Sequence, residues 1–366
     1  MDKYNILFVG SFKTVAKDGS VGGQMFACKT IINSKLSEVV NWTLIDSTAQ
    51  SNKKTNIIIR FFRAFLRILL LIFYLFNSKY HAVLIFTSNG MSFWEKGLMV
   101  FISKVLSKAN VIIAPRSGFI INDINKKGAL SKFIKIVFDK SDYVICQSKF
   151  WKLYFENISN NYNDKFQILE NCIEFSKYEN NVNEINHGDV IEILFLAWVD
   201  KNKGIFELID ACRLLKKDKI NFKLTIAGNG NEFDEVKRKI ELYNLENEIS
   251  LYGWALNSDK VKLLKRSNIF VLPSYYEGYP NSLIEAMASS NACIATNVGS
   301  IPDIIENGIN GYLINPQNTI ELYEKLRELL LDRKKIEILS LNAKQTIIKN
   351  NTSEIFTNKM RSILKL

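Results

Sequence analysis

The chain has 366 residues, 47% of them hydrophobic, which is typical of a globular protein with two domains of ordinary size. It contains two histidines, His81 and His187, which argues against a histidine-rich metal site or a Ser-His-Asp triad. The five scattered cysteines form no CxxC pair, so we expect reduced thiols in a cytosolic protein and no disulfide framework.

The formal net charge of +11 is unevenly distributed. Residues 1–150 contain 21 Lys and Arg against 8 Asp and Glu, a balance of +13, whereas the remainder contains 27 against 29, a balance of −2. This asymmetry indicates a polyanionic partner, either nucleic acid or an anionic membrane surface. Ordinary solubility charge is the alternative.

Short apolar runs that alternate with longer amphipathic ones predict a first set of buried strands. The first run, NILFVG, lies close to the start of the chain, so we expect no secretory leader. The predicted strands of this set cover 5–10, 40–45, 82–86, 111–114 and 143–147. Strand–helix alternation is typical of a parallel sheet covered on both faces.

One segment of the first half departs from this alternation. Residues 57–76 are apolar at 17 of 20 positions, and the exceptions, Arg60, Arg63 and Arg67, share one helical face. The nine uncharged residues that follow are too few to span a bilayer, which needs about 20. The segment is therefore either a core helix with its arginines in water, or a helix in the membrane plane with the arginines at the headgroups. The second reading is favoured by the nearby lysines, Lys53, Lys54 and Lys79.

An asparagine-rich stretch without apolar periodicity, 177–189, reads as a linker, and the alternation restarts after it. The strands predicted beyond it cover 191–197, 222–228, 249–253, 269–273 and 292–296. Two such sets joined by a linker predict an α/β protein with two doubly wound, Rossmann-like domains facing each other across a cleft.

Two loops that follow the first strand of each set carry residues suited to phosphate. Gly22 and Gly23, in GSVGGQMF, would let the backbone approach a phosphate closely. Lys203, in the loop after 191–197, could meet a diphosphate as a point charge. Each signal is weak alone, because glycine pairs and surface lysines are common.

Glu277 and Glu285 lie eight positions apart in PSYYEGYPNSLIEAMASS, a run of mostly apolar, aromatic or small residues. Glu277 follows a predicted strand, and the carboxyl edge of a parallel sheet faces the ligand crevice. Pro280 suits the first turn of a helix, where amides near Asn281 and Ser282 offer an anion site. Glu285, further along this helix, could accept ribose hydroxyls, and Glu277 the hydroxyls of a sugar beyond the phosphate.

Together these stretches resemble the family 4 (group 1) retaining glycosyltransferases, which have the GT-B fold. EGYPNSLIEAMA is similar to the family's E-x7-E motif, and NKGIFELIDA, IAGNG and VGSIPDIIENGINGYLI agree with its surroundings. The resemblance is strong over about 190–315. It is moderate at the glycine pair, VICQSKF and ILENCIEF, and thin elsewhere in the first half.

The resemblance implies an acceptor-binding domain over 1–176 and a nucleotide-sugar-binding domain over 177–349, with a C-terminal helix near 350–366 that is a candidate to pack back on the first domain. It implies retaining transfer of a hexose-type sugar from a nucleotide sugar, UDP-sugar favoured and GDP-sugar possible, without a metal or other cofactor. A lipid-linked or cell-envelope polysaccharide acceptor, such as one on a polyprenyl diphosphate, would explain the basic first half. We therefore expect peripheral attachment to the inner face of the cytoplasmic membrane.

The resemblance also implies roles for single residues. Glu285 holds the ribose, Glu277 the donor sugar and Lys203 the diphosphate, so catalysis falls to Glu277 and Lys203. The other donor-site candidates are Gly22, Gly23, Lys260, Asn281 and Ser282.

The chain departs from the family's pattern in two places. Many relatives have an arginine six residues before the phosphate lysine, whereas LAWVDKNK has Ala197 followed by Trp198, so that cation is missing. Many also carry a histidine near the donor sugar, where IIAPRSGF offers Arg116 and Ser117 as acceptor-side candidates. Arg116 cannot be a general base at ordinary pH. Front-face retention needs little from a protein base, since the leaving phosphate can take the acceptor proton, and stabilising that phosphate becomes the main catalytic task.

Two alternatives come from other classes. A GT-B-fold sugar-nucleotide epimerase would act at a similar cleft, but it needs dedicated acid/base carboxylates, and the surroundings of the two glutamates match it poorly. A non-enzymatic nucleic-acid-binding protein is suggested by charge alone, lacks a recognisable module and leaves both glutamates unexplained. We therefore expect no nucleic-acid partner.

Overall fold

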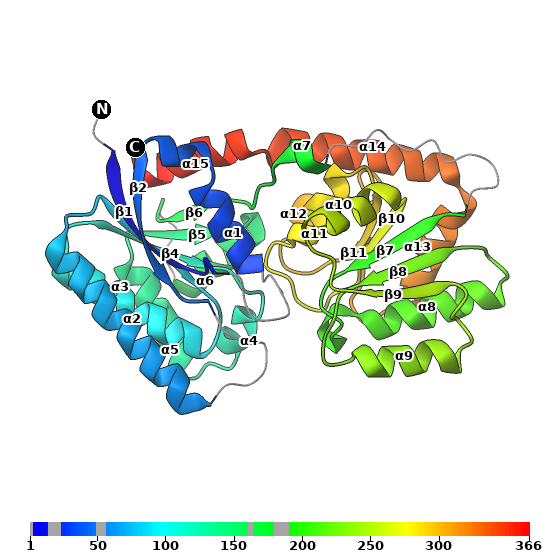
Figure 1. Ribbon diagram of the computed structural model, residues 1–366, viewed down its shortest axis with the longest axis horizontal. Helices are drawn as coiled ribbons and strands as arrows, with labels where there is room; N and C mark the ends of the chain where they lie inside the picture. The colour runs from blue at the N-terminus through cyan, green and yellow to red at the C-terminus, as the bar shows by residue number, and fades with distance from the viewer. Residues whose placement is uncertain (1–2, 14–22, 49–55, 160–163, 179–189) are drawn as a thin grey trace. The chain divides into compact units, whose positions relative to one another are not determined.

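The computed structural model describes residues 3–13, 23–48, 56–159, 164–178 and 190–366. It divides into two compact units, shown in Figure 1. Unit 1 comprises residues 1–172 and 353–366, and unit 2 comprises residues 173–352.

Unit 1 is built on a six-stranded parallel sheet with the strand order β2-β1-β3-β4-β5-β6. The strands are β1 (Tyr4–Gly10), β2 (Val40–Asp46), β3 (Ala82–Thr87), β4 (Asn110–Pro115), β5 (Tyr143–Cys146) and β6 (Phe166–Ile168). Because successive side chains of a strand point to opposite faces, Leu7 and Val9 enter one core while Ile6 and Phe8 enter the other. The uninterrupted apolar runs of the sequence follow from this burial on both faces.

Helices cover both faces of this sheet (Figure 1). The core that contains Leu7 is closed by α2 (Ile57–Asn77), α3 (Met91–Leu106), α4 (Ile120–Asn125), α5 (Ala129–Lys140) and α6 (Lys149–Ser159). The core that contains Phe8 is closed by α1 (Gly23–Ile32), the 3-10 helix η1 (Lys35–Glu38) and α15 (Ser353–Leu364).

The chain returns to unit 1 at its C-terminal end. Phe356, Met360 and Leu364 of α15 are buried in the core that contains Phe8, and the carbonyl oxygen of Leu364 lies 2.8 Å from Nε2 of His81. The chain passes between the units at residues 172/173 and 352/353. The first crossing lies before the predicted boundary at 176/177, because Ile173 pairs with Thr352 inside unit 2.

Unit 2 repeats the architecture with the strand order β12-β11-β10-β7-β8-β9, again parallel. Its strands are β7 (Glu192–Leu196), β8 (Lys223–Ala227), β9 (Ile249–Gly253), β10 (Ile269–Leu272), β11 (Ala292–Thr296) and β12 (Tyr312–Ile314). Its helices are α7 (Phe175–Tyr178), η2 (Lys201–Lys203), α8 (Ile205–Lys217), α9 (Phe233–Leu242), α10 (Asn257–Arg266), α11 (Asn281–Ala288), α12 (Ile301–Ile304), α13 (Thr319–Leu331) and α14 (Arg333–Asn350).

Each of the ten predicted strands is present, but each sheet has a sixth strand that the sequence reading missed. These are β6 and β12, which are three residues long and lie at a sheet edge, so they carry too little periodicity to be recognised. The predicted linker is also too long at its start, because Lys177 and Tyr178 belong to α7. Its remainder, 179–189, lies outside the described residues, as do Gly22, Lys53 and Lys54.

Candidate functional site

The sheet order of unit 2 fixes where its functional residues meet. From β7 the chain adds β8 and β9 on one side and then β10, β11 and β12 on the other, so β7 and β10 flank the topological switch point. Ligands of open parallel sheets bind outside the carboxyl ends of the strands at this point. Lys203 follows β7 and Glu277 follows β10, and both therefore belong to this edge.

Lys203 and Glu277 form an ion pair there. Nζ of Lys203 lies 2.6 Å from Oε1 of Glu277, and both side chains are largely buried. Lys203 is placed by η2, whose N-cap Asp200 accepts a hydrogen bond from the backbone of Asn202 at 2.8 Å. The structure thus brings together the two residues for which the sequence predicts catalytic roles.

Two glycines make the close packing around this pair possible. Gly204 and Gly299 both adopt positive φ, at +68° and +56°. A Cβ on Gly204 would lie 2.0 Å from the carbonyl oxygen of Pro273, and a Cβ on Gly299 would lie 2.0 Å from that of Glu277. Ser300 also donates a hydrogen bond to the carbonyl oxygen of Gly278. The segments that follow β7 and β11 therefore pack tightly, backbone against backbone, on the loop that carries Glu277.

Glu285 is buried on α11, with 2% of its surface exposed. Its Oε1 accepts hydrogen bonds from Nζ of Lys260 at 2.6 Å and from the hydroxyl of Tyr178 at 2.9 Å. Burial, with the neighbouring Glu285 carboxylate, raises the pKa of Tyr178, so its hydroxyl remains a donor. Lys260, a weak candidate from sequence, thus contacts the buried glutamate directly, and Tyr178 was missed because it lies at the edge of the predicted linker.

The start of α11 lies between the two glutamates. Pro280 occupies the N-cap position, no side chain caps the helix, and Asn281 and Ser282 form its first turn. The N–H groups of a first turn point out of the helix end, where the helix dipole favours an anion. This helix end follows β10 and Lys203 follows β7, so both provide positive potential at the carboxyl edge of the sheet beside the switch point.

The acceptor-side candidates lie in unit 1. Arg116 follows β4 and is half-buried; Nη1 donates to Oδ1 of Asn171 at 3.0 Å, and Cζ lies 4.2 Å from the ring centroid of Phe86. Burial lowers the pKa of Arg116 to about 10, so the group stays protonated at neutral pH. Ser117 donates from Oγ to Oδ1 of Asn89 at 3.1 Å. Gly23, the donor-site candidate of this unit, is the first residue of α1.

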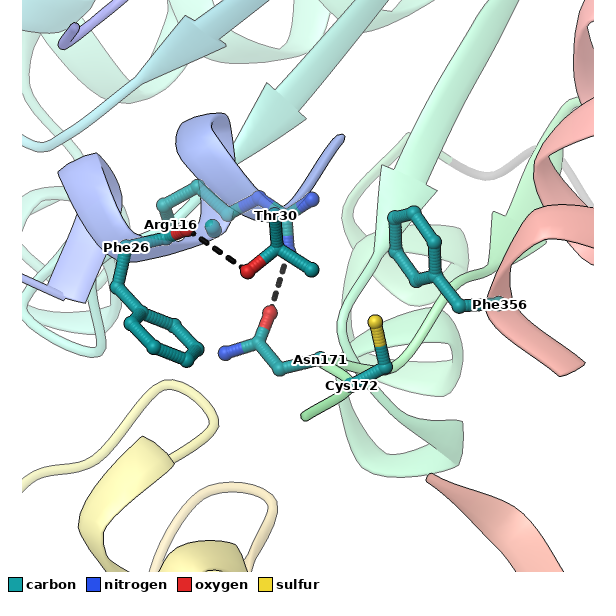
Figure 2. A pocket seen from close by; sticks show the side chains of 7 residues that line it. Phe26, Thr30, Arg116, Asn171, Cys172 and Phe356 are labelled. Atoms are coloured by element: carbon teal, nitrogen blue, oxygen red, sulfur yellow. Dashed lines mark hydrogen bonds between the residues drawn. The ribbon is translucent and has the colours of Figure 1, made fainter. Parts of the chain in front are cut away.

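Arg116 lines a small pocket beneath α1 (Figure 2). Its Nε and Nη2 atoms have no hydrogen-bond partner within the described ranges. The residues around the pocket are Phe26, Ala27, Thr30, Arg116, Asn171, Cys172 and Phe356. Arg116 is thus a half-buried cation, with Nε and Nη2 of its guanidinium enclosed by the protein.

Helix α2 contradicts one of the two readings of residues 57–76. Most of its apolar side chains are exposed, whereas Arg67 lies on the packed side, with Nε 2.6 Å from Oε1 of Glu95. A core helix with its arginines in water is therefore wrong. Arg60 is exposed and Arg63 is half-buried, so the three arginines do not form one row at the surface. No helix within the described ranges is long and apolar enough to cross a membrane.

The exposed side of α2 is large and continuous. Phe62 and Phe76 expose 61% and 72% of their surface, while Leu71 and Leu75 anchor the opposite side in the core. We call this surface the α2 apolar face; it comprises Ile57, Ile58, Phe61, Phe62, Phe65, Leu66, Leu69, Leu70, Phe73 and Phe76. Contiguous apolar patches are rare on monomeric soluble proteins, and where they occur they often mark sites of interaction.

Among the residues that the structure describes, no three His, Cys, Asp or Glu side chains are grouped so that they could hold a metal ion.

The sequence similarity to known protein families is clearest in unit 2. The sequence profile of the family described as glycosyl transferases group 1 matches residues 177–346. A putative colanic acid biosynthesis glycosyltransferase, WcaL, of Salmonella typhimurium is 27% identical over 185 residues, which is 49% of this chain and 46% of that protein. An Escherichia coli UDP-Gal:alpha-D-GlcNAc-diphosphoundecaprenol alpha-1,3-galactosyltransferase is 27% identical over 200 residues, 50% of each chain. The matches thus span about half the length of these relatives.

Solved structures match along the whole chain. Sucrose-phosphate synthase from Thermosynechococcus elongatus superposes with a TM-score of 0.81 at 15% identity, covering 99% of this chain and 98% of that one. HepE of Anabaena, solved with UDP and glucose, gives a TM-score of 0.73 at 14% identity, with 99% of both chains covered. Together with the two parallel six-stranded sheets, this likeness confirms the predicted GT-B fold.

Proposed function

We propose, from the match of residues 177–346 to the glycosyl transferases group 1, that the chain is a retaining glycosyltransferase of cell-surface polysaccharide synthesis. It transfers a hexose-type sugar from a nucleotide sugar, UDP-sugar favoured and GDP-sugar possible. The observation that carries the proposal is the pair of lysine–glutamate contacts, Lys203 with Glu277 and Lys260 with Glu285, whose two glutamates lie on the loop–helix segment that follows β10.

Each contact fits one part of the donor. The buried carboxylate of Glu285 accepts the ribose hydroxyls, and Lys260 beside it meets the nucleotide. The diphosphate lies between Lys203 and the first turn of α11, where a cation and a helix N-terminus favour its negative charge. Glu277, five residues beyond the end of β10, accepts hydroxyls of the transferred sugar.

The chemistry follows from this charge arrangement. The bond between the sugar's anomeric carbon and the diphosphate oxygen breaks, and the acceptor oxygen forms the new bond on the same face. The acceptor proton passes to the departing phosphate oxygen, so no side chain has to act as the base. Stabilisation of the leaving diphosphate is then the main catalytic contribution, and it falls to Lys203 and the α11 amides. We propose that this suffices without a metal ion; full activity in a chelator would support it, and rescue by manganese would contradict it.

The proposed acceptor is a glycan on a lipid diphosphate or on the cell envelope. Several relatives are named for the synthesis of such products, among them colanic acid and capsular polysaccharide. Arg116 is the acceptor-side cation in this proposal, with Ser117 beside it as a hydroxyl group. We further propose that the α2 apolar face inserts into the inner leaflet of the cytoplasmic membrane, and that the basic excess of residues 1–150 attracts anionic headgroups.

A thermal-shift screen against nucleotides and nucleotide sugars tests the enzyme assignment. A ligand that binds the folded state raises the unfolding midpoint, so one nucleoside diphosphate and one of its sugars should stand out. Transfer of radiolabelled sugar from that donor to membrane extract then measures the reaction. A panel in which no nucleotide raises the midpoint would overturn the proposal.

A further inference from the structure

Tyr178 and Lys260 hold the same oxygen of Glu285 from two sides. The hydroxyl of Tyr178 donates to Oε1 at 2.9 Å, and Nζ of Lys260 donates to it at 2.6 Å. Lys260 Nζ also lies 5.7 Å from the ring centroid of Tyr178, within reach of a cation–π contact. Because α7, α10 and α11 each supply one of these side chains, the orientation of the carboxylate depends on three elements.

These contacts hold the Glu285 carboxylate in one orientation, in which it can accept a hydrogen bond from a ligand. Tyr178 is 5% exposed, and its hydroxyl stays protonated, so it is the donor in the contact with the carboxylate, which can only accept. Both bonds end on Oε1, so a hydroxyl of a bound ligand would be received by Oε2. A carboxylate that is already oriented loses less freedom when a ligand binds, which favours affinity.

Tyr178 also lies close to residue 173, where the chain enters unit 2. The segment that leaves unit 2 at residue 352 is paired with this entry segment. Ile173 pairs with Thr352, and its N–H donates to the carbonyl oxygen of Asn351 at 3.0 Å. Nδ2 of the buried Asn351 donates to the hydroxyl of Tyr279 at 2.7 Å. Tyr279 lies between Glu277 and Glu285, so both crossing segments are hydrogen-bonded to the stretch that carries the two glutamates.

We propose that Tyr178 is a positioning residue for ribose recognition: it orients Glu285 so that the site selects nucleoside diphosphates that carry a 2′-hydroxyl. The proposal rests on the proposed function, because it assumes that Glu285 meets the ribose. Tyr178 acts through Glu285 and does not touch the reacting atoms. Its effect is therefore expected on donor affinity and on discrimination between ribose and deoxyribose, with turnover at saturation unchanged.

The test compares Tyr178→Phe with wild type, using UDP and 2′-deoxy-UDP in calorimetry, or the guanine pair if the screen selects GDP. Wild type is expected to prefer the ribonucleotide by roughly tenfold, and Tyr178→Phe to reduce that preference to about twofold, because Glu285 loses one of the two hydrogen bonds that orient it. The donor KM should rise by a similar factor while kcat stays constant. The phenyl ring keeps the packing, and the unfolding midpoint without nucleotide verifies that the variant folds.

The chain offers a matched control on elements that carry no donor-site candidate. The hydroxyl of Tyr312 donates to Oε1 of Glu328 at 2.6 Å, and Lys335 and Lys325 bind the same carboxylate. Tyr312→Phe removes the same kind of hydrogen bond from a tyrosine–glutamate–lysine group on β12, α13 and α14. It is expected to keep the full ribose preference, and a loss equal to that of Tyr178→Phe would overturn the inference.

The remaining outcomes separate the inference from the function on which it rests. If Glu285→Gln loses the ribose preference but Tyr178→Phe retains it, the positioning role is wrong and the donor site stands. If Tyr178→Phe binds UDP more tightly than wild type, the hydroxyl competes with the ribose and the inference is overturned. If Glu285→Gln retains the preference, the assignment of Glu285 to the ribose fails first.

Discussion

Nζ of Lys203 and Oε1 of Glu277 lie 2.6 Å apart, so the two charges neutralise each other. In the proposed function, a diphosphate that binds Lys203 has to compete with this carboxylate. The two partners should therefore respond differently to substitution.

Replacing Glu277 with Gln should leave nucleoside diphosphate affinity within about threefold of wild type, because Lys203 is then no longer neutralised and can still meet the diphosphate. Turnover should fall by about 100-fold or more, since the sugar loses a charged acceptor on the scale of 1.5–3 kcal/mol and its orientation. Calorimetry with the diphosphate and a transfer assay measure the two quantities. A loss of nucleotide affinity as large as that of the next variant would reverse the assigned roles.

Replacing Glu285 with Gln should act on nucleotide binding itself. The buried carboxylate loses its charge-assisted bonds to the ribose, so affinity should fall by about 1.5–3 kcal/mol, roughly 10- to 150-fold. The unfolding midpoint without nucleotide is the control, because Lys260 also loses its ionic partner. Unchanged affinity in a folded variant would place the ribose elsewhere.

The α2 apolar face should govern membrane binding. We expect wild-type protein to sediment with phosphatidylglycerol vesicles at low salt, and less with neutral vesicles, because apolar insertion and basic charge act together. Replacing Phe62, Phe65 and Phe73 with Gln should abolish sedimentation while nucleotide binding is kept, since each buried phenylalanine contributes about 1.5–3 kcal/mol.

The matched control for this experiment lies on α14, where Ile338, Leu341 and Ile348 are also exposed. Replacing these three residues with Gln should leave sedimentation unchanged. If wild-type protein sediments with neither kind of vesicle, the α2 apolar face does not bind membranes. If both triple variants lose sedimentation equally, the binding is not specific to α2.

The contact between Arg67 and Glu95 should make unit 1 sensitive to acid. Burial alone would raise the pKa of Glu95, but the hydrogen bond from Arg67 and the charge of Lys96 outweigh it, and the pKa lies below its usual value. The stabilisation is therefore complete above the unfolded-state pKa, about 4.3, and is lost as pH falls through the lower folded-state value. Chemical denaturation at pH values from 7 to 3 measures how the free energy of unfolding changes with pH. That free energy should fall less for Glu95→Gln than for wild type. An equal fall in both proteins would refute the role of this contact.

The same pair gives a stability prediction at neutral pH. Arg67→Gln leaves a buried carboxylate without its bidentate partner and should lower the free energy of unfolding by about 2 kcal/mol. Arg60→Gln is the control, because Arg60 is exposed and should change stability little.

The sequence predicted the strands and the helix 57–76, because periodicity and apolar runs are local properties of the chain. Which face of that helix turns outward could not be predicted, since it depends on Glu95, which lies 28 positions beyond Arg67. The contact between Lys203 and Glu277 could be anticipated, because both follow strands of one parallel sheet. Tyr178 could not, since its partner Glu285 is 107 positions away and its neighbours in the chain are polar.

The position of α15 has a consequence for biosynthesis. Unit 1 buries Phe356, Met360 and Leu364 of α15, yet these residues are translated after the whole of unit 2. The core that contains Phe8 therefore stays open on one side while the ribosome completes nearly the entire chain, and the unit begun first is finished last. A nonsense mutation just before residue 353 would leave unit 2 intact but remove α15 from unit 1. The apolar surface exposed on unit 1 would cost several kcal/mol of its stability. A mutation late in the gene would thus destabilise the unit that is encoded mostly by the first half of the gene.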